Sequence, residues 1–155
     1  MTGAVWLEPT FHRLAAAMLL GAVIGFERQW RRKSTGIRTN ALVCFGAAAF
    51  VDLGSTIGGP SELARIISYV VSGVGFIGAG AIIKDAEGGV RGLNTAATLW
   101  CTAAVGACTG AGEILDALYA TVFLIAINVA LGPVGRWVDA KRPRPAPQPA
   151  QEEDE

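Results

Sequence analysis

Residues 66–83 read Ile-Ile-Ser-Tyr-Val-Val-Ser-Gly-Val-Gly-Phe-Ile-Gly-Ala-Gly-Ala-Ile-Ile, a stretch without a charged side chain. This is close to the roughly 20 apolar residues that a helix needs to cross a hydrocarbon core. Similar runs cover residues 14–26, 93–112 and 117–135, and another, 39–57, is interrupted only by Asp52. The five runs are numbered below in chain order, so that 14–26 is the first and 39–57 the second. The first run is short, so we expect its helix to begin near Thr10. The pattern predicts an all-α integral membrane protein with about five transmembrane helices.

Basic residues are distributed unevenly among the connections between these runs. Eleven of the 13 Lys and Arg residues lie between the first and second runs, between the third and fourth, or after the last. Only Arg13 and Arg65 remain for the other side. The positive-inside rule therefore predicts an outside N-terminus and a cytoplasmic C-terminus.

The composition excludes several other classes of protein. The net formal charge is zero and topology explains the basic segments, so we expect no nucleic-acid partner. Cys44, Cys101 and Cys108 all lie inside apolar runs, and this odd, intramembrane set predicts free thiols. Residues 139–155 are rich in Pro and end in acidic residues, which predicts a disordered cytoplasmic tail after a transmembrane domain of residues 1–138.

Small residues are expected to hold the helices together, because lipid tails remove the hydrophobic drive for helix association. Gly21 and Gly25 form a GxxxG pair, and residues 46–49 are a small-residue patch. In the third run, small residues lie along one stripe: Ser68, Ser72, Gly75 and Ala79. We predict that these positions are helix contacts.

Two acidic residues in or next to the runs each allow two interpretations. Asp52 could bind a cation or carry a proton, but a structural pair with Arg13 or Arg65 is the more economical reading. Glu27 is followed four residues later by Arg31, a spacing that suits a helical ion pair. It could equally reach Arg38 and fasten the first connection, and a structural role is expected in either case.

The fourth run carries an unusual polar pattern. Asn94, Thr98 and Cys101 have the spacing i, i+4 and i+7, which places them on one helical face. Asn94 could hydrogen-bond to another helix within the membrane, or it could cap the start of its own helix. Thr98 could bond to a carbonyl of its own helix, and Cys101 could act as a small buried hydrophobe. Both a recognition face and plain packing remain open.

Four motifs follow one another along the chain: Gly25-Phe-Glu-Arg-Gln-Trp30, Gly36-Ile-Arg-Thr-Asn-Ala41, Ser72-Gly-Val-Gly-Phe-Ile-Gly-Ala-Gly80 and Arg91-Gly-Leu-Asn-Thr-Ala-Ala-Thr-Leu-Trp-Cys101. Together they make the chain resemble the MgtC/SapB family of bacterial inner-membrane proteins, over about residues 14–138. The resemblance implies a multi-pass protein that supports growth at low magnesium and, in pathogens, virulence through survival inside macrophages. It also implies that Asn94 and Cys101 match the family's functional Asn and Cys.

The motifs contain Glu27, Arg28, Arg38 and Arg91, for which we expect structural roles. Longer members of the family continue into a cytoplasmic C-terminal domain, and this chain resembles a short form that has the Pro-rich, acidic tail in its place.

These residues fit three possible functions to different degrees. The resemblance favours a regulatory subunit that binds another inner-membrane protein, such as the proton-conducting part of ATP synthase or a sensor kinase. A magnesium or other cation transporter is the alternative, although Asp52 alone supplies few oxygen ligands unless a homo-oligomer brings several copies together. An intramembrane enzyme is disfavoured, because the only histidine, His12, is expected on the outer side of another helix, whereas Cys101 is expected in the membrane interior. We expect no catalytic residue, metal or cofactor.

Overall fold

A computed structural model describes residues 4–84 and 89–141 of the chain. Within them the helices are α1 (Ala4–Trp30), α2 (Ile37–Ile57), α3 (Pro60–Gly80), α4 (Leu93–Ala111) and α5 (Ile114–Ala140). Strands β1 (Ile83–Lys84) and β2 (Val90–Arg91) form a short antiparallel hairpin before α4, with Ile83 opposite Arg91. The predicted all-α architecture with five long helices is confirmed, and the hairpin is an addition to it.

Four helices contain stretches that are long and apolar enough to cross a hydrocarbon core. Among the described residues these stretches are Pro9–Trp30, Ile37–Ile57, Pro60–Gly80 and Ile114–Gly135. Helix α4 has 19 residues, or about 28 Å at about 1.5 Å per residue, but its threonines and Asn94 make it less apolar. The fold is therefore that of a multi-pass helical membrane protein with one more polar helix.

Helix α1 begins at Ala4, and not near Thr10 as the sequence suggested. Pro9 is the sixth residue of α1, where its missing backbone N–H removes one helical hydrogen bond near the N-terminus of the helix. The expectation that the helix begins near Thr10 was therefore wrong. The predicted tail lies outside the described residues except for 139–141, of which 139 and 140 still belong to α5.

The chain divides into two compact units, residues 1–125 and 126–155. The first unit contains α1 to α4 and the N-terminal part of α5. The second contains the rest of α5, which remains helical through Pro133.

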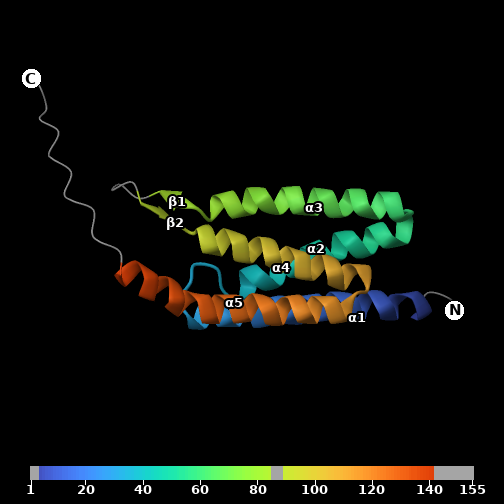
Figure 1. Cartoon of the computed structure of the whole chain (residues 1–155). Coiled ribbons are helices and arrows are strands. Elements are labelled where there is room, and N and C mark those ends of the chain that lie inside the picture. Colours follow the sequence, from blue (N-terminus) through green and yellow to red (C-terminus); the bar gives the residue numbers. More distant parts are fainter. Residues whose placement is uncertain (1–3, 85–88, 142–155) are drawn as a thin grey trace, which may run out of the picture. The chain divides into compact units, whose positions relative to one another are not determined.

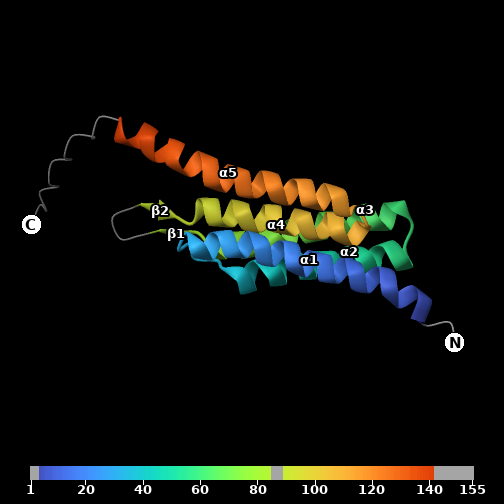
Figure 2. The same cartoon turned by 90° about the horizontal axis from the view of Figure 1, so that it is seen from below.

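In the first unit, α4 runs between α3 and α1 and also packs on α2 (Figure 1). The α1–α2 connection and the β1–β2 hairpin lie at one end of this unit, and the α2–α3 and α4–α5 turns lie at the other (Figure 2). The first of these ends carries Arg28, Arg31, Arg32, Lys33, Arg38, Lys84 and Arg91, and we call it the basic end. The opposite end is called the outer end, after the predicted orientation.

Glycines bring the backbones of α1, α2 and α4 into close contact. A Cβ at Gly21 would lie 2.6 Å from the carbonyl oxygen of Asn40, so α1 approaches α2 as its GxxxG pair predicts. Gly106 and Gly110 form a second such pair on α4, where a Cβ would overlap backbone oxygens of α2. Because glycine has no Cβ, these three helices can pack backbone to backbone.

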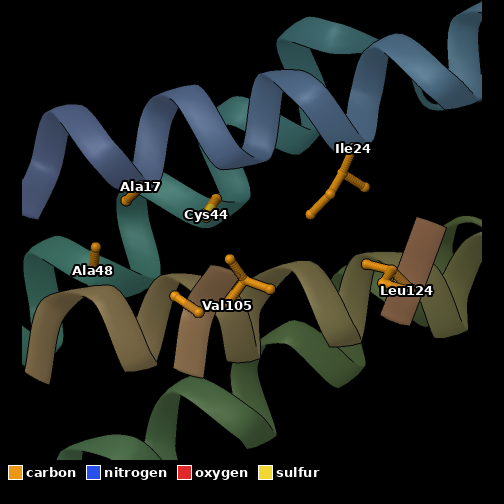
Figure 3. Close-up of a cluster of buried hydrophobic side chains, with 7 residues drawn as sticks. Ala17, Ile24, Cys44, Ala48, Val105 and Leu124 are labelled. Atoms are coloured by element: carbon orange, nitrogen blue, oxygen red, sulfur yellow. The ribbon is translucent and has the colours of Figure 1, made fainter. Parts of the chain in front are cut away.

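The apolar core of the first unit lies where four helices meet. Figure 3 shows Ala17 and Ile24 of α1 facing Cys44 of α2, Val105 of α4 and Leu124 of α5. A smaller cluster joins Ala47, Val74 and Ala103 of α2, α3 and α4. Core side chains are mostly small, as expected where close helix contact drives the packing.

Helix α3 departs from the expected packing. Its predicted contact stripe of Ser68, Ser72, Gly75 and Ala79 is exposed, and only Val74 and Gly78 of α3 are buried. The stripe prediction was therefore wrong for this chain. Small residues permit close contact between helices, but they do not select which face of a helix makes it.

Candidate functional site

Two glycines in left-handed conformation bracket α4, the helix with the predicted functional residues. Gly92 and Gly112 both have φ of 92°, a region that residues with a Cβ rarely adopt. Gly92 occupies the N-cap position and makes no side-chain cap bond. A Cβ there would also overlap the carbonyl oxygen of Ala81. Gly92 thus sets the tight turn from β2 into α4.

The three residues predicted to share one face of α4 have different surroundings. Asn94 is exposed in the first turn, and it is not the N-cap, which is Gly92. Thr98 is buried, and its hydroxyl donates to the carbonyl oxygen of Asn94 at 2.8 Å. Cys101 is partly exposed and packs at the edge of the apolar core. The face therefore straddles the boundary between the interior and the surface.

A mostly small-residue surface extends from Asn94 along the N-terminal half of α4. We call it the α4 strip, and it consists of Asn94, Ala97, Trp100, Cys101 and Ala104. Trp100 is 49% exposed. The strip presents one amide and two alanines that would let a second helix approach closely.

Four threonines line the buried face of α4, and of these the sequence analysis singled out Thr98 alone: Thr95, Thr98, Thr102 and Thr109. The hydroxyl of Thr102 donates to Asn40 Oδ1 of α2 at 3.1 Å and also contacts the carbonyl oxygen of Thr98. Asn40 Nδ2 in turn donates to the carbonyl oxygen of Gly36 at 3.0 Å. The spacing i, i+3 and i+7 of Thr95, Thr98 and Thr102 was the available sequence signal. Thr102 therefore ties α4 to α2, whereas the hydroxyls of Thr98 and Thr109 bond within α4.

Arg28 provides the corresponding link between α1 and α4 at the basic end. Its side chain is 1% exposed, and Nη2 donates to Thr95 Oγ1 at 2.7 Å. Thr95 Oγ1 also lies 3.3 Å from Ser34 Oγ in the α1–α2 connection. A buried guanidinium is stable only with hydrogen-bond partners, so Arg28 and Thr95 fix the two helices to each other.

Glu27 lies beside this cluster and pairs with Arg31, at 2.7 Å between Oε1 and Nε. Neither carboxylate oxygen has a hydrogen-bond partner, so the contact with Arg31 is an ion pair alone. The pair joins the last turn of α1 to the turn that follows it, whereas Arg38 lies exposed in the first turn of α2. Arg91 is exposed on β2.

Asp52 is held by two residues of α1 at the outer end. Arg13 Nη1 donates to its Oδ1 at 2.8 Å and Thr10 Oγ1 donates to its Oδ2 at 2.9 Å. Arg13 also reaches the carbonyl oxygen of Gly110 near the end of α4, at 3.4 Å. Arg65 pairs instead with Glu62 of α3. The guanidinium neutralises the Asp52 carboxylate and joins α1, α2 and α4.

The residues available for metal binding are sparse. Within residues 4–84 and 89–141 no three His, Cys, Asp or Glu side chains gather into a potential metal site. All three cysteines are free thiols, with Cys44 buried and Cys101 and Cys108 partly exposed.

Comparisons with known proteins relate this arrangement to a family. The model of the MgtC family matches residues 14–137. Protein MgtC of Brucella abortus is 54% identical over 84% of this chain and 55% of its own length. Protein MgtC of Salmonella typhimurium is 51% identical over 79% of this chain and 52% of its own length. The chain thus spans about half the length of these relatives, and no solved structure matches it.

Proposed function

Because the chain belongs to the MgtC family, we propose that it is a regulatory protein of the bacterial inner membrane that binds another membrane protein through the α4 strip. The observation that carries this proposal is the exposure of Asn94 on a helix whose threonines all face the interior. An exposed amide at the membrane boundary can hydrogen-bond to a partner helix.

The other residues of the α4 strip support the same proposal. Ala97 and Ala104 leave room for a second helix to approach, and Trp100 offers a large apolar contact. Cys101 lies beside them and packs on the core, so binding of a partner at the strip would alter side-chain packing inside the bundle. These residues lie in the part of the chain that matches the family model.

Adaptation to low magnesium and, in a pathogen, virulence belong to this proposal through the family resemblance. The partner would be an inner-membrane protein such as the proton-conducting part of ATP synthase or a sensor kinase. Asp52 gives less support to cation transport, because Arg13 already neutralises its charge at 2.8 Å. The regulatory role is therefore the better-supported function.

Growth of a host strain that depends on this protein at limiting magnesium tests the proposal. Asn94→Ala removes the amide and Ala97→Leu blocks close approach, while both positions are exposed enough to leave folding intact. We expect both variants to lose the growth benefit at unchanged membrane abundance. The matched control Ala79→Leu, on the exposed side of α3, should grow normally. Normal growth of Ala97→Leu would contradict a helix-binding role for the strip.

The proposed orientation places the basic end in the cytoplasm. A reporter that is active only in the cytoplasm should be active when fused after Lys141 and silent when fused after Gly59. The reverse pattern would invert the orientation.

A further inference from the structure

Several buried polar atoms at the basic end lack a hydrogen-bond partner. They are Arg28 Nε, Thr35 Oγ1 and both carboxylate oxygens of Glu27. Buried polar groups in folded proteins are nearly always paired, with protein atoms, with ordered water or with a bound ion. These atoms therefore indicate that a polar species binds beside them.

The two unpaired donors lie in neighbouring segments of the fold. Arg28 is joined through Thr95 Oγ1 to Ser34, with distances of 2.7 and 3.3 Å. Thr35 follows Ser34 and leads directly into Gly36, the N-cap of α2. A Cβ at Gly25, one turn before Arg28, would lie 2.7 Å from the carbonyl oxygen of Gly36, so this part of α1 lies against the N-terminus of α2.

The start of α2 has the electrostatics of an anion site. Gly36 makes no side-chain cap bond, and the first turn has no acidic residue. Gln29 Oε1 satisfies the N–H of Ile37 at 3.2 Å, but the protein places no negative charge at this positive end of the helix dipole. Arg38 adds another positive charge there. The N-terminus of a long helix in this state attracts anions.

The charge of the surrounding segment selects an anion over a cation. Residues 27–38 contain five basic residues and one acidic residue, Glu27, which leaves a net charge of four positive. Arg31 already neutralises Glu27 at 2.7 Å, so its unpaired oxygens are left for ordered water. A cation at this place would face four excess positive charges.

We propose that this place binds a phosphate group, with Arg28 and Thr35 as buried donors and Lys33 and Arg38 as outer positive charges. A phosphate offers several oxygens to donors that converge from different directions, which suits a guanidinium, a hydroxyl and a helix N-terminus. Phe26 and Trp30 are exposed at the same level of α1, on the side of the helix away from Arg28, with ring centroids 5.9 Å apart. Such aromatics mark the level of lipid headgroups, so an anionic phospholipid is the favoured source of the phosphate.

Binding of defined lipids to the purified full chain tests this site. Native mass spectrometry would compare phosphatidylglycerol with phosphatidylcholine, and thermal protection would be measured with inorganic phosphate. Thr35→Val keeps the charge and shape but removes the unpaired hydroxyl, and should weaken phosphatidylglycerol binding about tenfold. Arg38→Gln should weaken it as well. The matched control Arg65→Gln at the outer end should bind like the wild type.

The outcomes separate a built site from diffuse charge. Loss of phosphatidylglycerol selectivity in Thr35→Val and Arg38→Gln, but not in Arg65→Gln, supports a lipid phosphate. Protection by inorganic phosphate with the same variant pattern, without lipid selectivity, supports a soluble phosphate in the same site. Wild-type binding of both probes by Thr35→Val would overturn the proposal, because net charge alone would then attract the lipid and ordered water would satisfy the hydroxyl. If Thr35→Val does not fold, wild-type binding of both probes by Arg38→Gln overturns it equally.

Discussion

Replacing Thr95 with valine would remove the hydrogen-bond acceptor of the Arg28 guanidinium, which is 1% exposed. Valine has nearly the shape of threonine, so the change leaves little cavity and mainly deprives Arg28 Nη2 of its 2.7 Å bond. Hydrogen bonds within membranes average only about 0.6 kcal/mol. A bond to a buried charged group is worth about 1.5 to 3 kcal/mol, and we expect Thr95→Val to lower the free energy of unfolding by about 2 kcal/mol.

Reversible unfolding in mixed micelles, followed by circular dichroism, measures this loss. Thr109→Val is the matched control, because Thr109 is equally buried on α4 but its hydroxyl donates only to the carbonyl oxygen of Val105 in its own helix. A hydroxyl that bonds to its own helix contributes little, so the control should change stability by less than about 0.5 kcal/mol. Equal losses in the two variants would refute the assignment of Arg28 and Thr95 as the link between α1 and α4.

Three further changes test other contacts of the fold. Gly110→Leu should sharply lower membrane abundance, because any side chain there overlaps the backbone of Ala48, whereas Gly73→Ala, which meets open space, should leave abundance unchanged on immunoblots. Asp52→Asn should lower the free energy of unfolding by about 1 kcal/mol in the same assay. Neither this variant nor the wild type should take up magnesium in liposomes. Uptake by the wild type that the variant loses would instead support the transporter function. Arg32 has φ of 53° in the turn that ends α1, so Arg32→Gly should raise the free energy of unfolding by about 0.5 to 1 kcal/mol, and a loss would show that the arginine side chain itself stabilises the turn.

Helix positions could be predicted from the sequence because membrane helices need long uncharged runs. Gly21 and Gly25 could also be assigned to a contact, since GxxxG pairs let backbones approach. The side of α3 that packs against the other helices could not be predicted, because small residues occur on both sides. Composition alone does not distinguish a side that faces lipid from one that faces protein. The start of α1 was missed because the expected helix extended the short uncharged run only to about Thr10, whereas α1 continues through Pro9 to Ala4.

The candidate site was predicted in part. Asn94 stood out as an amide in an apolar run, but the burial of Arg28 could not be foreseen, because an arginine at the end of a run usually marks the membrane boundary. Thr95 and Thr102 gave little signal, since a threonine can satisfy its hydroxyl within its own helix. Their bonds to other helices depend on which side of α4 faces the core, which only the packing decides.

Photocrosslinking in native membranes tests the central claim most directly. A photoreactive phenylalanine analogue at Trp100 would lie within the α4 strip, and the same residue at Phe76 of α3, which is 86% exposed, is the matched control. In cells grown at low magnesium we expect a specific adduct with another membrane protein from position 100, absent from position 76 and lost when Asn94→Ala is added. An adduct of equal yield from both positions, or one that Asn94→Ala leaves unchanged, would contradict binding through the α4 strip.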